Sequence, residues 1–259
     1  MNERLLQRLI SSACLARDIE LRVLSDGWLL EMRKDHQVHR VLGTDFGLNT
    51  QVSAAIAKDK VATSIILERA GIRHIKHELL SSHGHIVNES ELESAVTHWP
   101  AVLKPLEGSH GTHVFRVDSA KQIIDIISSV ESSWALSTYV DVQSEIRLVL
   151  VDGDIRLAHL KQAPVIRNGL KLFNLHAGAT AVPVSADELP GEVVRLALSA
   201  MTALDLRMAA VDIVTTSSGE RFVLEVNAAF SLNRFAATNE RAYAMTADFY
   251  DQLSDQIFS

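Results

Sequence analysis

Two short turns in the C-terminal half of the chain constrain its fold more than any other feature. Each contains glycine and separates two runs of apolar residues: Asp152-Gly153 within residues 145–160, and Ser218-Gly219 within residues 209–227. Such a turn between apolar runs is the strongest short-range signal for a β-hairpin. We therefore expect two antiparallel hairpins at the centre of this half.

The second hairpin brings acidic side chains together. If Ser218-Gly219 is a two-residue turn, Asp212 and Glu225 face each other across the ladder, with Cβ atoms roughly 4.5–5.5 Å apart. Asn227 shares the face of Glu225, because side chains alternate along a strand. Two opposed carboxylates among apolar residues are costly, and a divalent cation such as Mg²⁺ removes that cost. The alternative is that one carboxylate is solvated or salt-bridged.

A glycine-rich loop follows an expected strand at residues 101–104, and a second strand returns at residues 113–117. The loop consists of Glu107, Gly108, Ser109, His110 and Gly111. Glycines let backbone N–H groups approach phosphate oxygens, and Lys104 before the loop would neutralise their charge. Because a strand follows instead of a helix, the loop is neither a P-loop nor a dinucleotide fingerprint. An ordinary hairpin turn is the alternative.

Three further basic residues lie where an anionic ligand would need them. Lys60 lies early in a helical stretch, Arg147 shares a strand face with Glu145, and Lys161 ends the first hairpin. A solvated surface position is the alternative for each one.

Periodicity and turn residues predict the remaining elements. Residues 74–90 are expected to be loop-like or extended, and Gly71 is expected to cap the helix before them. The expected helices cover residues 3–17, 51–70, 90–97, 119–128, 190–204 and those from 239 onward, and the other expected strands cover residues 20–24, 28–32 and 135–140.

Composition excludes several classes of protein. The net charge of −7 argues against a nucleic-acid binder, and the apolar runs are too short for a membrane span. The N-terminus lacks a signal-peptide pattern. Cys14 is the only cysteine, so an internal disulfide is impossible and a cytoplasmic location is expected.

Five segments stand in the order found in one known family. They are Asp59-Lys60 with ILERAGI, then VLKPLEGSHG, STYVDVQSEIRLVLVDGDIRLAHLK, FNLHAGATAVPV, and AAVDIV with FVLEVNAA. Over about residues 49–235 the chain resembles the ATP-grasp superfamily. The resemblance is greatest to the branch of the ribosomal-protein glutamate ligase, the lysine-biosynthesis ligases, glutathione synthetase and cyanophycin synthetase.

The resemblance implies an α/β fold of the ATP-grasp type, with two α+β lobes that clamp ATP. Residues 1–48 would form a short N-terminal α/β segment, a remnant of the domain that precedes the ATP-grasp core in the family. Residues 49–138 would form the lobe with the glycine loop, and residues 139–259 the lobe with the metal-binding hairpin. Such a short N-terminal segment is compatible with a homodimer, or with a partner subunit that completes the substrate site.

The resemblance also implies how ATP is held. Lys60 and Lys104 would contact its phosphates, and the glycine loop would close over the β- and γ-phosphates. Glu145 would hold the ribose hydroxyls. The adenine would lie against the hinge strand made of Ser137, Thr138, Tyr139 and Val140.

The remaining implied roles concern the reaction. Arg147 and Lys161 would lie near the γ-phosphate and the acyl phosphate, and Asn174 near the metal and the transferring phosphoryl group. The ligands of Mg²⁺, or of Mn²⁺ as the alternative cation, would be Asp212, Glu225 and Asn227.

The implied activity is that of an ATP-dependent carboxylate–amine ligase that forms an amide bond through an acyl phosphate. Its substrates would be an amino acid, a small peptide or a protein tail. The alternatives are a phosphotransferase with a hydroxyl acceptor and a non-catalytic ATP-binding regulatory module. The chain departs from the family pattern at Thr138, His113, Ala177 and Phe230, which affects the expected acceptor site and loop more than ATP binding.

Overall fold

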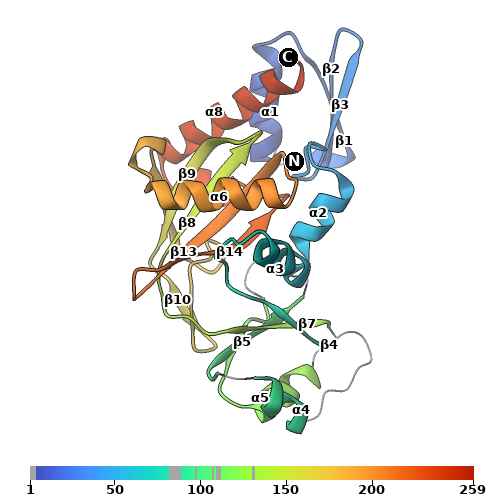
Figure 1. The fold of residues 1–259 in the computed structure, drawn as a ribbon. Coiled ribbons are helices and arrows are strands. Elements are labelled where there is room, and N and C mark those ends of the chain that lie inside the picture. The colour runs from blue at the N-terminus through green and yellow to red at the C-terminus, as the bar shows by residue number, and fades with distance from the viewer. Residues whose placement is uncertain (1–3, 82–88, 97, 107, 109–111, 130–131) are drawn as a thin grey trace.

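The computed structural model describes residues 4–81, 89–96, 98–106, 108, 112–129 and 132–259. A large lobe is built around a five-stranded antiparallel sheet, and a small lobe around a four-stranded one (Figure 1). Strands of the large sheet lie in the order β12-β9-β8-β13-β14. Their bounds are β8 Val142–Val151, β9 Asp154–Gln162, β12 Thr180–Val184, β13 Met208–Thr216 and β14 Arg221–Asn227.

Both expected hairpins are confirmed as antiparallel pairs, β8 with β9 and β13 with β14. In the first, Asp152 and Gly153 form the two-residue turn and both have positive φ, 49° and 85°. These angles suit a turn whose twist matches that of the flanking strands.

The turn of the second hairpin is one residue longer than expected. The Thr216 N–H donates to the Glu220 carbonyl, so residues 217–219 form the turn. Farther along, Ile213 pairs with Val223 and Asp212 pairs with Glu225, which leaves Leu224 as a bulged extra residue. The bulge offsets the longer turn, and the predicted pairing of Asp212 with Glu225 is confirmed.

The two faces of the large sheet are covered differently. Helix α6 (Gly191–Ala203) packs on one face, where Leu148, Val211 and Ile213 join its apolar core. On the other face, helices α1 (Leu5–Leu15) and α8 (Glu240–Ile257) cover one end of the strands, including Val149. The rest of that face remains available for a site.

The N-terminal segment is part of the core of the large lobe. Leu6, Leu9, Ile10 and Ala13 are buried at helical spacing along α1, which contacts α8. The segment continues as a three-stranded sheet of β1 (Glu20–Leu24), β2 (Leu29–Lys34) and β3 (Gln37–Leu42). One apolar cluster joins these elements to β8, β9 and α8.

The small lobe has an apolar core of its own. Its strands lie in the order β4-β7-β5-β6, and the buried Leu103, Ile123 and Trp134 join them to the helices. The elements are β4 Glu78–Ser81, β5 Ala101–Pro105, β6 Phe115–Val117, β7 Trp134–Thr138, α4 Glu89–Ala95 and α5 Ala120–Ile127.

The single helix expected over residues 51–70 is wrong, because Asp59 divides it into α2 (Gln51–Lys58) and α3 (Lys60–Arg69). Asp59 has an extended backbone, and its carboxylate accepts hydrogen bonds from the N–H groups of Val61 and Ala62. It therefore caps α3 and places Lys60 in the first turn. The expected C-cap at Gly71 is confirmed by its φ of 67° and the bond from Ile72 N–H to the Leu67 carbonyl.

Several elements were not expected from the sequence. Residues 74–90 were expected to be loop-like or extended, which β4 fits, but the parallel bridge of His74 with Val223 of β14 was not expected. The others are β3, β12, β10 Val165–Arg167, β11 Leu170–Leu172, α7 Asn233–Ala236 and two 3₁₀ turns, Ser25–Gly27 and Ala186–Glu188. None of the helices in the described parts of the chain has the length and apolar character needed to cross a membrane.

The shared core predicts that α1 contributes to the stability of the whole large lobe. Ile10 is fully buried, so Ile10→Ala should lower the free energy of unfolding by about 2–5 kcal/mol. Leu15→Ala, in the same helix but 83% exposed, should change it by less than about 0.5 kcal/mol. Urea denaturation of both variants measures this, and a loss below about 1 kcal/mol for Ile10→Ala would contradict the shared core.

Candidate active site

A row of charged side chains crosses the uncovered part of the large sheet. Arg147 of β8 lies opposite Asp212 of β13, and Asp212 lies opposite Glu225 of β14. Beside this row, Glu145 of β8 lies opposite Lys161 of β9. Because alternate residues share a face, the register brings all five side chains to one surface of the sheet.

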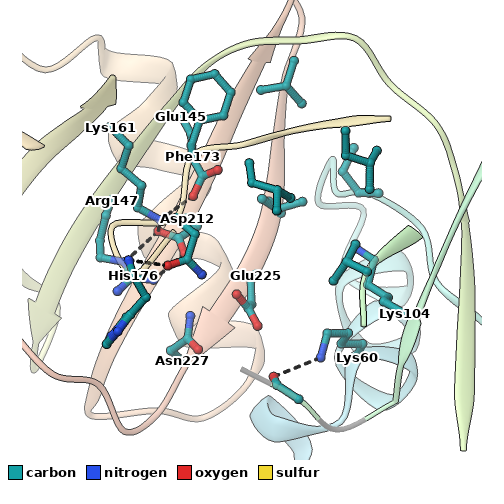
Figure 2. Close-up of a pocket in the computed structure, with 18 of the residues that line it drawn as sticks. Lys60, Lys104, Glu145, Arg147, Lys161, Phe173, His176, Asp212, Glu225 and Asn227 are labelled. Carbon is teal, nitrogen blue, oxygen red and sulfur yellow. Dashed lines mark hydrogen bonds and ion pairs between the residues drawn. The ribbon is translucent and has the colours of Figure 1, made fainter. Parts of the chain in front are cut away.

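Ion pairs connect most of this row (Figure 2). Arg147 donates two hydrogen bonds to the Asp212 carboxylate, at 2.8 and 2.6 Å. Lys161 donates to Asp212 at 3.0 Å and also to Glu145. Asp212 is 1% exposed, Lys161 5% and Glu145 7%. Each buried charge therefore has an opposite charge in direct contact, as burial requires.

The pKa values of the carboxyls follow from this pairing. Burial raises the pKa of Asp212, but the Arg147 and Lys161 charges outweigh it and hold that pKa well below its usual range. Burial raises the pKa of Glu145, against the lowering effect of Lys161. The two carboxyl groups therefore differ in proton affinity: Asp212 stays ionised, whereas Glu145 binds a proton more readily.

The donor set at the end of the row suits a divalent cation. Two carboxylates and one amide, from Asp212, Glu225 and Asn227, give only oxygen ligands, which Mg²⁺ prefers. The Asn227 Nδ2 is buried and has no hydrogen-bond partner among the described residues. The described residues hold no group of three His, Cys, Asp or Glu side chains arranged for a metal. Mg²⁺ is commonly held by one or two carboxylates together with water and substrate oxygens, which this donor set allows.

Asp212 is also the salt-bridged carboxylate that the sequence left open as an alternative. Both of its oxygens accept hydrogen bonds from Arg147 or Lys161. A cation bound to Asp212 would share it with these two residues.

Two lysines, one from α3 and one from β5, face the row from the other side of the cavity (Figure 2). Lys60 of α3 donates to the carbonyls of Leu106 and Gly108, both at 3.4 Å, and so contacts the start of the glycine loop. Lys104 of β5 has a pKa lowered to about 8, first by burial and also by Lys60, with Glu225 acting in the opposite direction. The two lysines form a basic region close to the hairpin carboxylates.

One cavity of about 510 Å³ connects these groups. Its lining includes most of the residues singled out in the sequence: Lys60, Lys104, Gly108, Ser137, Thr138, Tyr139, Val140, Glu145, Arg147, Lys161, Asn174, Asp212, Glu225 and Asn227. The predicted loop residues Glu107, Ser109, His110 and Gly111 lie outside the described residues.

The connection between the lobes forms one wall of the cavity. Ser137 is buried on β7 opposite Val102, and its hydroxyl has no hydrogen-bond partner in the described part of the chain. The Tyr139 N–H donates to the Pro100 carbonyl, and the Arg116 guanidinium lies 5.1 Å from the Tyr139 ring centre. This wall thus offers an aromatic side chain and an unpaired buried hydroxyl.

Asn174 lies in a tight turn that also lines the cavity. Its side chain accepts a hydrogen bond from the His176 N–H at 2.8 Å, and its carbonyl accepts from Ala177 and Ala179. The turn holds Asn174 and the neighbouring Phe173 and His176 at the cavity.

Several residues of the cavity were missed by sequence reasoning. Thr44 and Arg234 line it, although neither belongs to a recognisable motif. Beside these lining residues, His159 was also missed: it lies opposite Arg147 on the same sheet face and stacks on Phe235 with ring centres 4.6 Å apart. Burial first, and then Arg147, lowers the pKa of His159 to about 3, so the ring is neutral. Alternation along β9 from Lys161 was the only sequence signal for this position.

Comparison with known proteins gives a family and a shared fold. A family model described as a RimK-like ATP-grasp domain matches residues 57–246. A probable alpha-L-glutamate ligase of Psychromonas ingrahamii is 27% identical over 218 residues, which cover 82% of this chain and 68% of that protein. A probable alpha-L-glutamate ligase 2 of Shewanella amazonensis is 29% identical over 189 residues, or 71% of this chain and 60% of that protein.

Solved structures share the fold at lower identity. D-alanine–D-alanine ligase from Bacillus anthracis complexed with ATP matches with a TM-score of 0.59 and 20% identity, over 81% of this chain and 69% of that one. A bifunctional glutathione synthetase from Pasteurella multocida matches with a TM-score of 0.60 and 13% identity, over 96% of this chain and 44% of that one.

The buried ion pairs predict a large stability effect at Asp212. Asp212→Asn leaves Arg147 buried without its counter-charge, so the free energy of unfolding should fall by about 3 kcal/mol. Asp141→Asn breaks an exposed pair with Lys171 and should cost less than about 1 kcal/mol. Urea denaturation compares the two, and equal small losses would mean that the Asp212 pairing is not required for folding.

Proposed function

This chain belongs to the RimK-like ATP-grasp family, and we propose from that membership that it is an ATP-dependent carboxylate–amine ligase. One observation carries the proposal at the level of residues. The charged row from Arg147 through the buried Asp212 to Glu225 and the basic pair Lys60 and Lys104 face the same cavity. A triphosphate needs such a combination of cations and metal-binding oxygens.

In this proposal the nucleotide lies between the lobes. Lys60 and Lys104 contact its phosphates, and Glu145 is available to the ribose. The hinge of Ser137, Thr138, Tyr139 and Val140 lies against the adenine. The lobe boundary near residue 138 belongs to the same proposal, since β7 ends at Thr138 and β8 begins at Val142.

Asp212, Glu225 and Asn227 are proposed to hold a divalent cation, with Mg²⁺ favoured and Mn²⁺ as the alternative. Such a cation, when bound, neutralises charge on phosphate oxygens and orients them. Arg147 and Lys161 are cations next to the same carboxylate, so they stabilise negative charge that spreads over the transferring phosphoryl group. Asn174 lines the same cavity, and its amide N–H is proposed to donate to that group.

The reaction then proceeds in two steps. An oxygen of the substrate carboxylate attacks the γ-phosphorus, and ADP leaves. The amine nitrogen attacks the carbonyl carbon of the resulting acyl phosphate, loses a proton, and inorganic phosphate leaves. Water must be excluded in between, because hydrolysis would destroy the acyl phosphate.

The proposed substrates are a carboxylate and an amine carried by an amino acid, a peptide or a protein tail. Relatives bear the name alpha-L-glutamate ligase, which supports testing L-glutamate as the first amine. A hydroxyl acceptor would give a stable phosphoester instead of an amide.

The ligase proposal predicts substrate-dependent release of ADP and phosphate from Mg²⁺-ATP. A panel of amino acids and dipeptides, starting with L-glutamate, is compared between the wild type, Glu225→Gln and Glu220→Gln. Glu225→Gln should lower the rate at least about 100-fold, because a ligand that acts on the phosphoryl group is lost. Glu220→Gln, at the exposed position directly after the turn of the same hairpin, should remain active. Full activity of Glu225→Gln, or release without an amide product, would refute the ligase.

The lowered pKa of Lys104 predicts a pH dependence of ATP binding. With a pKa of about 8, Lys104 is charged below that pH and neutral above it. If only the charged lysine binds phosphate, the Kd for ATP should rise about tenfold between about pH 7 and about pH 9.

Lys104→Arg stays charged throughout this range, so its Kd should change little. Lys121→Arg, at an exposed position of α5, is the control and should behave as the wild type. Equilibrium titration at each pH measures the effect. If the Kd of Lys104→Arg rises with pH as much as that of the wild type, Lys104 does not bind the phosphates.

A further inference from the structure

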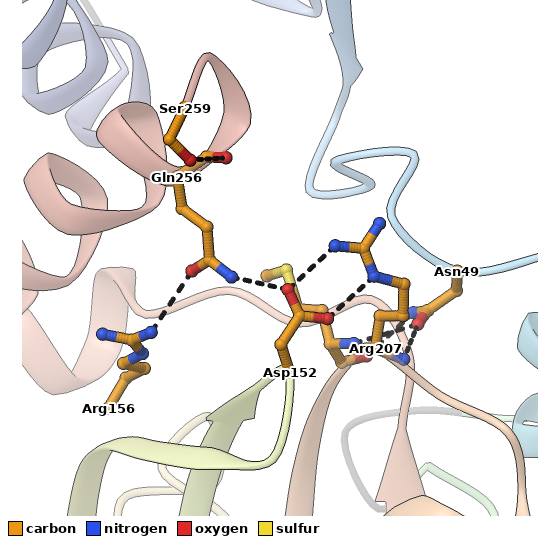
Figure 3. Close-up of polar contacts among 7 residues, drawn as sticks. Asn49, Asp152, Arg156, Arg207, Gln256 and Ser259 are labelled. Atoms are coloured by element: carbon orange, nitrogen blue, oxygen red, sulfur yellow. Dashed lines mark hydrogen bonds and ion pairs between the residues drawn. The ribbon is translucent and has the colours of Figure 1, made fainter.

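One side chain outside the cavity joins both strands of the proposed metal-binding hairpin, and Figure 3 shows its contacts on the side of β13. Asn49 accepts hydrogen bonds from the N–H groups of Arg207 and Met208, at 2.9 and 3.0 Å. Its amide nitrogen donates to the carbonyls of Met208, at 2.8 Å, and Ala228, at 3.3 Å. The single side chain thus uses both donors and both lone pairs of its amide on backbone groups.

These contacts lie where the ladder between β13 and β14 ends. Ala210 with Asn227 is the last backbone pair, Met208 is the first residue of β13, and Ala228 directly follows β14. Asn49 therefore acts as one more rung, made by a side chain, immediately beyond Asn227.

Asn227 depends on its backbone for its position. The Nδ2 of its side chain is buried without a hydrogen-bond partner in the described parts of the structure. The position of its amide is therefore set by the backbone of β14. Asn49 anchors that backbone by its hydrogen bond to the carbonyl of the next residue, Ala228.

The other polar contacts around Asn49 are more exposed and do not reach β14. Arg207 pairs with Asp152 at 2.7 and 2.8 Å, and Gln256 of α8 donates to Asp152. Exposed pairs of this kind contribute little to stability. Asn49 is thus the member of the network that transmits position to the cation site.

We propose that Asn49 is a positioning residue for the cation site, which it serves by fixing the backbone that carries Asn227. The inference rests on the proposed function, because it takes Asn227 as a cation ligand. It predicts a loss of the cation's contribution to nucleotide binding when Asn49 is changed, with nucleotide binding itself preserved.

Calorimetric titration of the full chain with ADP measures this, once with Mn²⁺ and once with EDTA. The ratio of the Kd in EDTA to the Kd in Mn²⁺ measures how much the cation strengthens ADP binding. Asn49→Ala should lower this ratio about tenfold, as loss of a group that orients a metal ligand commonly does. Asn49→Asp keeps the acceptor for Arg207 and Met208 but sets a carboxylate oxygen against two carbonyls, so it should lower the ratio at least as much.

Gln256→Ala is the matched control, because it removes a contact of the same network without touching β13 or β14. Its ratio should equal that of the wild type. An unchanged ratio in both Asn49 variants, or an equal loss in Mn²⁺ and in EDTA, would overturn the inference. If Asn49→Ala does not fold, Asn49→Ser and Asn49→Asp decide.

Glu225→Gln separates this inference from the proposed function. If that variant keeps the wild-type ratio, the cation site itself is wrongly assigned, and the inference falls with it. If Glu225→Gln lowers this ratio of Kd values while the Asn49 variants keep the wild-type ratio, the cation site stands and only the role of Asn49 is refuted.

Discussion

The pairing of Asp212 with Arg147 and Lys161 is the interaction on which the rest of the site depends. Their charges lie on a buried sheet face, where an unpaired ion would cost far more than one hydrogen bond contributes. The register of four neighbouring strands brings these opposite charges into contact. Helices α1, α6 and α8 cover the remaining surface with apolar side chains, so the charged row is confined to the cavity.

This arrangement gives the site two kinds of positive charge with different roles. Arg147 and Lys161 are held in place by the carboxylates that they neutralise. Lys60 of α3 contacts loop carbonyls, and Lys104 of β5, in the small lobe, approaches Glu225 across the cavity. A ligand that carries several negative charges would therefore be contacted by both lobes at once, which suits a site that must shield a reactive intermediate from water.

Sequence reasoning reached the parts of this structure that are encoded locally. The two hairpins were predictable from their turns, but the pairing of Asp212 with Glu225, predicted for a two-residue turn, holds only because the bulge at Leu224 offsets a three-residue turn. The break at Asp59 was missed because the apolar pattern continues through it, although its capping carboxylate is a local signal. Contacts between distant segments, such as those of Asn49 with Met208 and Ala228, carry no local pattern at all.

The bulges at Arg156 and Leu224 restrict how this protein can change during evolution. Each adds one residue between a hairpin turn and the charged row, and a shift by one residue turns every side chain of a strand to the opposite face. A single deletion between the Asp152 turn and Lys161, or between the Ser218 turn and Glu225, would move a charged residue from the cavity into apolar packing. An insertion or deletion in either hairpin therefore keeps the charged row on the cavity face only if a second change compensates for it, a constraint that does not apply to loops away from the row.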